Sequence, residues 1–160
     1  MAGGGGGVVI FFFAFFKNSS IFAAVIKNGM TKKEIVEHWI KLSDNDLKVA
    51  EDLFVLKHYL YVGFMCHQSI EKIFKAYFAK LNDTPPPFTH DLRIISTKGN
   101  FSEELPEEQK QFIRILSPLN IRLRYPEYKD MIFKQMTKDV TWDILQKTKN
   151  LQQWIKEKLS

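Results

Sequence analysis

The chain has 160 residues, a length that suits one domain with a single hydrophobic core. Hydrophobic residues make up 45% and charged residues 26%, which is ordinary for a soluble globular protein, and the one cysteine excludes an intramolecular disulfide framework. We therefore expect a reducing, cytoplasmic location. The net charge of +5 favours, weakly, an acidic partner such as a nucleic acid, a nucleotide or an anionic protein face.

The first 29 residues differ from the rest of the chain. A glycine run is followed by a wholly apolar run, Val8 to Phe16, which is too short for a transmembrane helix of about 20 residues and lacks the basic start of a signal peptide. Met30 stands directly before Thr31 and Glu34, the capping-box start of a helix. We predict that 1–29 is a non-native or disordered extension and that 30–160 is one domain. A membrane anchor or signal peptide is the alternative.

The apolar residues after Met30 recur with a helical period. They predict a long helix from Thr31 to about Lys57, with a bend where Ser43 could cap a second segment. After a short turn that begins at His58, a second helix runs to about Leu81, where three prolines end it. The two helices should be antiparallel neighbours because the link between them is short.

The second half of the chain is predicted to continue with helices. Thr89 should cap a short one, and another should begin near Pro106 and end or kink at Pro118. Pro126 argues against a helix in the segment that follows, and a last helix should run from near Thr137 to the terminus. No stretch alternates with period two, so the sequence predicts an all-α, up-and-down bundle of about five helices.

The second helix carries an unusual mixture of side chains. His67, Gln68, Glu71, Lys72 and Lys75 recur at helical spacing beside an apolar stripe, so their polar ends can meet. A helix that serves only the core has no need of these residue types there. This edge is where we expect function, whereas Cys66, on the stripe itself, is best explained as a small buried hydrophobe.

Four short motifs follow one another along the chain and carry a resemblance. They are Ser43-Asp44-x-Asp46-Leu47-x-x-Ala50, Cys66-His67-Gln68-x-x-Glu71-Lys72-x-x-Lys75-Ala76, Pro86-x-x-Thr89-His90-Asp91-Leu92 and Arg124-Tyr125-Pro126. Together, and over roughly Met30 to Leu159, they resemble the HEPN domain family, the nucleotide-binding domain named for higher eukaryotes and prokaryotes. The resemblance implies a helical bundle that usually dimerises and forms a polar cleft near the dimer interface.

The resemblance also implies a functional setting. Family members often accompany a minimal nucleotidyltransferase, many are RNA-cleaving toxins of toxin–antitoxin and related systems, and others are noncatalytic nucleotide- or RNA-binding modules. The cleaving members carry an arginine followed, four to six residues later, by a histidine. In this chain no histidine follows any arginine, and Tyr128 after Arg124 is a poor general base at neutral pH. The chain resembles an Arg-Tyr-Pro branch of the family, and the missing motif favours a noncatalytic protein over an enzyme.

The candidate site residues fall into two groups. The phosphate-binding candidates are Arg124, Arg122, His67, Lys72 and Lys75; the candidates for a cleft or interface network are Asp46, Gln68, Glu71, His90 and Tyr128. Arginine binds phosphate with two parallel hydrogen bonds, although either arginine could instead pair with Asp46 or Glu71. The two lysines could also form a solvated edge. We predict no catalytic residue, no cofactor and no metal, since His67 and Glu71 alone are too few for a zinc site.

Three functions remain open at this point. The first is a dimeric module that holds a nucleotide or RNA phosphate and partners a nucleotidyltransferase in a toxin–antitoxin-like system. The second is a metal-independent endoribonuclease toxin that combines Arg124 with a substitute acid–base such as His67, His90 or Tyr128. The third is a noncatalytic dimerisation scaffold without a ligand. We expect no membrane partner.

Overall fold

The computed structural model describes residues 29–122 and 126–160, and the side chains in these ranges except those of 121–130. The predicted extension, 1–29, therefore lies almost wholly outside the described residues. Lys32–Ser160 form one compact unit, which is the subject of the following paragraphs.

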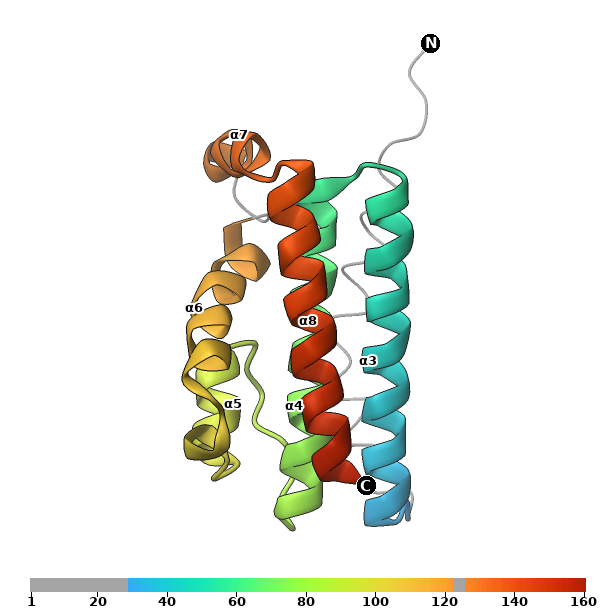
Figure 1. Ribbon diagram of the computed structural model, residues 1–160. Helices are drawn as coiled ribbons and strands as arrows, with labels where there is room; N and C mark the ends of the chain where they lie inside the picture. Colours follow the sequence, from blue (N-terminus) through green and yellow to red (C-terminus); the bar gives the residue numbers. More distant parts are fainter. Residues whose placement is uncertain (1–28, 123–125) are drawn as a thin grey trace. The chain divides into compact units, whose positions relative to one another are not determined.

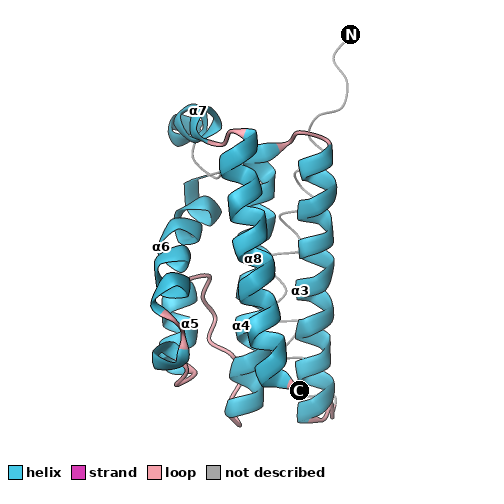
Figure 2. Cartoon of the chain, in the orientation of Figure 1, coloured by secondary structure: helices cyan, strands magenta, loops and turns pink. Residues whose placement is uncertain are grey.

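This unit is helical throughout, and the part of the chain that the structure describes contains no strand (Figure 2). The helices are α3 (Lys32–Val55), α4 (Tyr59–Leu81), α5 (Leu92–Lys98), α6 (Glu107–Arg122), α7 (Pro126–Gln135) and α8 (Lys138–Leu159), with a 3₁₀ turn, η1 (Ser102–Glu104). The prediction of an all-α bundle is confirmed.

Helix α4 lies at the centre of the bundle. The long helices α3 and α8 run alongside it, and α5 and α6 lie on the other side of α4 (Figure 1). Residues from every side of α4 are buried, among them Val62, Ile70 and Phe74. A helix that is covered all round is the core of its domain, so whatever polar groups α4 carries are held inside the protein.

The prediction of one long first helix is confirmed, whereas the predicted cap of the short helix is wrong. Helix α3 is continuous through Ser43, whose buried hydroxyl donates to the Ser69 carbonyl oxygen at 2.8 Å instead of capping a second segment. Asp91, not Thr89, caps α5: its side chain accepts from the backbone N–H of Arg93 at 2.9 Å. The hydroxyl oxygen of Thr89, two residues before the cap, accepts from the backbone N–H of Asp91. The Asp91 carboxylate, a stronger cap than the Thr89 hydroxyl, decides where α5 begins.

The prediction at Pro126 is wrong, and the helix that contains Pro118 does not end there. Helix α6 continues past Pro118 to Arg122, and the buried side chains of Leu116 and Leu119 hold it against the core. Pro126 does not prevent a helix but begins α7, at the position where a fixed φ and a missing N–H cost least. The last helix begins next to Thr137, as predicted, and Thr137 caps α8 by accepting from the N–H of Val140 at 3.3 Å.

Candidate functional site

One turn of α4 carries polar side chains where an apolar core would be expected. His67, Gln68, Ser69 and Glu71 are all buried, although they lie in the middle of the most deeply covered helix. A buried polar group costs free energy unless it is hydrogen-bonded, and a buried charge costs more unless it is paired. The partners of these four residues therefore define what this part of the molecule is for.

Glu71 is the centre of a charged network. One oxygen of its carboxylate, Oε1, accepts from Lys75 Nζ at 2.6 Å, and the other, Oε2, lies 2.9 Å from His90 Nδ1. Lys75 comes from the next turn of α4, and its ammonium also lies 5.4 Å from the centre of the Trp39 ring on α3. His90 comes from the loop before α5 and brings that loop back onto α4.

The network keeps Glu71 ionised. Burial by itself would raise the pKa of the carboxyl group, but the hydrogen bond with His90 and the charge of Lys75 together lower the pKa to about 2. An ionised carboxylate can only accept, so the proton in its bond with His90 is on Nδ1. The His90 side chain is 36% exposed, so this buried carboxylate orients an imidazole that reaches the surface.

A second ion pair lies next to the first. Lys72 donates to Asp46 on α3, and the two side chains are 14% and 13% exposed. Burial raises the pKa of Asp46 even though the Lys72 ammonium opposes this change. Lys75 is similarly covered, at 12%. The two lysines thus do not form a solvated edge, because carboxylates from α3 and α4 hold them against the bundle.

His67 differs from its neighbours because neither ring nitrogen has a hydrogen-bond partner among the described residues. The backbone of His90 and the carboxylate of Glu71 lie near the ring, but burial outweighs both and lowers the pKa of His67 to about 4. His67 is consequently neutral at physiological pH. It does not pair with Glu71, whose two oxygens are occupied by Lys75 and His90.

The remaining buried polar residues of α4 make neutral hydrogen bonds. Gln68 Nε2 donates to Asn120 Oδ1 on α6 at 3.3 Å. Ser69 donates to the Ser43 carbonyl oxygen at 3.0 Å, and Gln152 on α8 donates to the Ser43 hydroxyl at 2.9 Å and to the Ser69 hydroxyl at 3.3 Å. Sequence reasoning missed this Ser43–Ser69–Gln152 cluster. The available signal was a serine in the middle of each of two long helices.

Cys66, next to these residues, is buried and unpaired in any disulfide, as predicted. Burial raises the pKa of its thiol to about 12, so the thiol stays protonated and unreactive.

The structure brings together most of those predicted network residues that it describes. Asp46, Glu71, Lys72, Lys75 and His90 form the two adjoining ion-paired groups, with His67 beside them. Arg124 lies outside the described residues, as do the side chains of Arg122 and Tyr128. Their place in the site therefore stays a prediction.

Within the described residues, no group of three or more histidine, cysteine, aspartate or glutamate side chains is placed to hold a metal ion. Among the described helices, none combines the length and the apolar character that a membrane crossing requires.

Comparison with known proteins identifies the class to which this fold and site belong. The model of the HEPN domain family matches residues 36–159, which spans α3 to α8 almost completely. The chain belongs to the HEPN domain family. Searches of curated proteins and of solved structures gave no match.

Proposed function

We propose that this chain is a noncatalytic nucleotide- or RNA-binding module that acts as a dimer and partners a minimal nucleotidyltransferase in a toxin–antitoxin-like system. The observation that carries the proposal is the family match over residues 36–159, since membership of this family implies a nucleotide or RNA ligand. The charged network on α4 supports the proposal. Buried ion pairs add little net stability compared with apolar side chains, so a function explains their presence more readily.

The charges of the network limit how a phosphate could bind. Lys72 and Lys75 are each balanced by a carboxylate, Asp46 and Glu71, so the four side chains together carry no net charge. His90 adds one positive charge when protonated. An anionic ligand at this edge therefore needs a further cation, and Arg124, or Arg122, is the residue that we expect to supply it. The two lysine–carboxylate ion pairs then fix α3 and α4 beside the ligand.

Binding of nucleotides and RNA by the purified full chain tests this proposal. Isothermal titration with AMP and ATP, and fluorescence anisotropy with a labelled RNA oligonucleotide, should show binding that Arg124→Ala weakens by about tenfold or more. The matched control is Arg114→Ala, which removes an exposed arginine of α6 that lies 4.0 Å from Glu107. No binding of any of these ligands would favour the scaffold instead.

Dimerisation and partnership require separate measurements. Multi-angle light scattering of the full chain should give the mass of two copies. Co-expression with the product of the adjacent reading frame should yield a complex if that frame encodes a nucleotidyltransferase. A monomer at all accessible concentrations would contradict the dimeric part of the proposal.

One observation favours the endoribonuclease as a second candidate. A buried, ionised Glu71 holds the Nδ1–H of a partly exposed His90 at 2.9 Å, which is how proteins orient a histidine for proton transfer. Incubation with total RNA in the presence of EDTA tests it. Cleavage that is lost in both Arg124→Ala and His90→Gln, but kept in Arg114→Ala, would replace the noncatalytic proposal with this one.

A further inference from the structure

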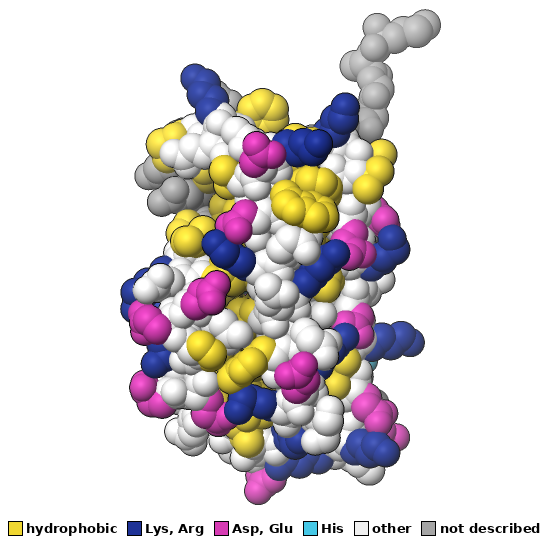
Figure 3. Space-filling model, viewed as in Figure 1, with side chains coloured by type: hydrophobic (Ala, Val, Ile, Leu, Met, Phe, Trp, Pro, Cys, Tyr) yellow, Lys and Arg dark blue, Asp and Glu magenta, His cyan; other side chains and the backbone are white. Residues whose placement is uncertain are grey.

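One end of the bundle exposes apolar side chains that the charged network does not involve. Six of the eleven large apolar side chains that are exposed among the described residues lie at the end of α3, on α7 or at the start of α8. We call this group the apolar end; its members are Val55, Leu56, Met131, Phe133, Val140 and Trp142, and they are between 45% and 76% exposed. Figure 3 shows apolar side chains gathered over this part of the surface.

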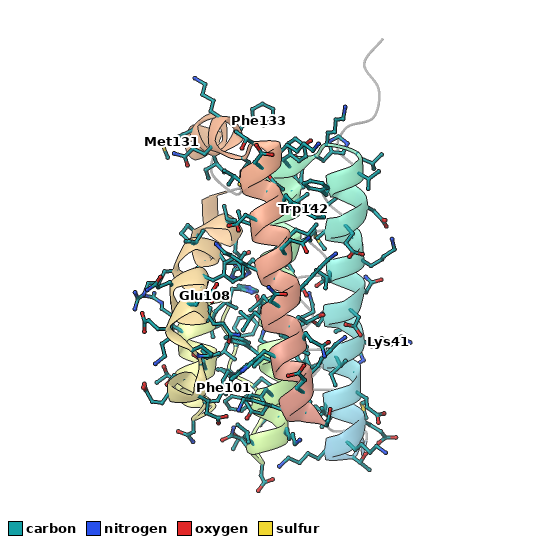
Figure 4. All side chains as sticks on the ribbon, viewed as in Figure 1. Lys41, Phe101, Glu108, Met131, Phe133 and Trp142 are labelled. Carbon is teal, nitrogen blue, oxygen red and sulfur yellow. The ribbon has the colours of Figure 1, made fainter. Side chains whose placement is uncertain are left out.

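Packing against the bundle holds the apolar end in place. The Trp142 ring lies 5.3 Å from the Phe54 ring of α3, which in turn lies 5.5 Å from the Tyr59 ring of α4. Trp142 projects from α8, while Met131 and Phe133 lie on α7 (Figure 4). Ile132 and Met136, between and beyond them, are buried and attach α7 to the core. A large, preorganised aromatic side chain of this kind is typical of the centre of a protein interface.

Three exposed lysines lie within two residues of these apolar residues in the chain. Lys57 comes directly after Leu56, Lys134 directly after Phe133, and Lys138 two residues before Val140. None of the three makes an ion pair with any described residue, whereas the neighbouring carboxylates of Glu51, Asp52 and Asp143 are already paired with lysines. Asp139 is also exposed there, so among these described side chains three lysines stand against one carboxylate without an ion pair, and positive charge prevails around the apolar end.

The backbone at Lys57 supplies an independent observation. Helix α3 ends with the N–H of His58 bonded to the Leu53 carbonyl oxygen at 2.9 Å and that of Lys57 to the Phe54 carbonyl oxygen at 3.0 Å, and Lys57 has a φ of 63°. Helices that end in this way usually have glycine at this position, since a side chain is strained there. A lysine in place of glycine keeps a cation beside Leu56 at the expense of stability.

From these features we infer that the apolar end is a docking surface for a protein partner that presents apolar side chains surrounded by carboxylates. Apolar anchors provide the affinity and charge complementarity provides the orientation. A second copy of this chain would bring the same lysines to the interface. An anionic bilayer would also meet the carboxylates of Asp139 and Asp143, whereas a protein can place its acids opposite the lysines alone.

The test uses the full chain and a display library of amphipathic helical peptides whose polar faces are acidic, basic or neutral. The enriched peptides should have acidic faces. Their affinity should fall about tenfold or more in Trp142→Ser and in Leu56→Ser. The matched control is Phe88→Ser, which removes an apolar side chain that is 79% exposed in the loop after α4. It should leave the affinity unchanged.

Lys57→Gly separates docking from folding. The substitution should raise the urea concentration at the midpoint of unfolding, because it relieves the strained backbone. It should also weaken peptide binding, because it removes a cation. Lys41→Glu, at an exposed position of α3, is the control for charge (Figure 4). Arg124→Ala should leave peptide binding intact, and Lys57→Gly should leave nucleotide binding intact, so this inference and the proposed function can fail separately.

Four results would overturn the inference. The first is a selection that enriches basic peptides, neutral peptides or no peptide, and the second is a loss of affinity in Phe88→Ser as large as that in Trp142→Ser. The other two are binding to phosphatidylcholine–phosphatidylserine vesicles and self-association, if either is lost in Trp142→Ser.

Discussion

Helix α4 carries two buried polar clusters that are built from different chemistry. On the side of α3 and α8, the neutral side chains of Ser43, Ser69 and Gln152 exchange hydrogen bonds, partly with backbone oxygens, at 2.8 to 3.3 Å, and Gln152 also donates to the Asp44 carboxylate at 3.1 Å. Farther along α4, Glu71 is held by two charged or chargeable side chains, Lys75 and His90. The first cluster fixes how three helices pack. The second takes a charge out of water and needs both of its partners to offset the cost.

The difference between the two clusters indicates which buried polar residues of a helical bundle can serve a function. A neutral cluster with backbone partners is satisfied inside one chain and has nothing left to offer a ligand. A charged cluster that ends in a partly exposed imidazole extends to the surface of the bundle. His67 lies beside the second cluster, and neither of its nitrogens is satisfied by the described residues. The four predictions below test this contrast.

The largest effect is expected from removing the carboxylate at the centre of the charged cluster. Glu71→Ala leaves Lys75 and His90 without their acceptor in a buried setting, so the free energy of unfolding should fall by about 3–5 kcal/mol at pH 7. Urea unfolding followed by circular dichroism measures this loss. Glu71→Leu combined with Lys75→Leu should recover most of it. A loss in Glu71→Ala no greater than that in Ser69→Ala would remove the distinction between the clusters.

Acid should destabilise the protein through His67. Its pKa is about 4 in the folded chain and near 6.5 when unfolded, so between these values only the unfolded state takes up the proton. Stability should fall by about 3 kcal/mol as the pH is lowered from 6.5 to 4.

His67→Leu should abolish this slope and should also stabilise the protein by about 1 kcal/mol at pH 7, because it removes unsatisfied polar atoms. The Glu71 contribution, present above pH 4.5 and lost toward pH 2, should remain. Unfolding midpoints across the pH range provide the measurement, with His38→Gln as the histidine control. An unchanged slope in His67→Leu would contradict the neutral, buried state of this residue.

A smaller effect is expected in the neutral cluster. Gln152→Ala removes the amide that bridges Ser43 and Ser69 and that also donates to Asp44, and should cost about 1–2 kcal/mol. The loss should be the same at pH 5 and pH 8, since none of the three side chains titrates. Gln153→Ala, which removes the adjacent exposed glutamine of α8, is the matched control and should change little. A pH-dependent loss in Gln152→Ala would mean that the two clusters are coupled.

The smallest effect is expected at an ion pair on the surface. Lys147 and Asp143 of α8 lie 2.8 Å apart but are 37% and 59% exposed, so water competes for both charges. Lys147→Ala should therefore change the free energy of unfolding by less than about 0.5 kcal/mol. A larger loss would show that solvent exposure, the basis of the contrast with Lys75, does not decide the strength of these pairs.

The sequence by itself determined the fold class and the family of this protein. Helical periodicity and the capping residues gave the long helices, because these signals are local, and four motifs in order gave the HEPN resemblance that the family match confirms. The same reasoning singled out the polar edge of α4 from the spacing of His67, Glu71 and Lys75. It failed at Pro126, which begins a helix instead of excluding one, and at Thr89, because Asp91 caps α5.

Only the tertiary structure decided which polar side chains meet. Spacing on a helix shows that His67 and Glu71 can pair, but it cannot show that a loop brings His90 to Glu71 first and leaves His67 without a hydrogen bond to any described residue. The pairing of Lys72 with Asp46 and the Ser43–Ser69–Gln152 cluster likewise join residues 26 or more positions apart. Such contacts depend on how helices pack, and packing is a property of the whole chain rather than of any one segment.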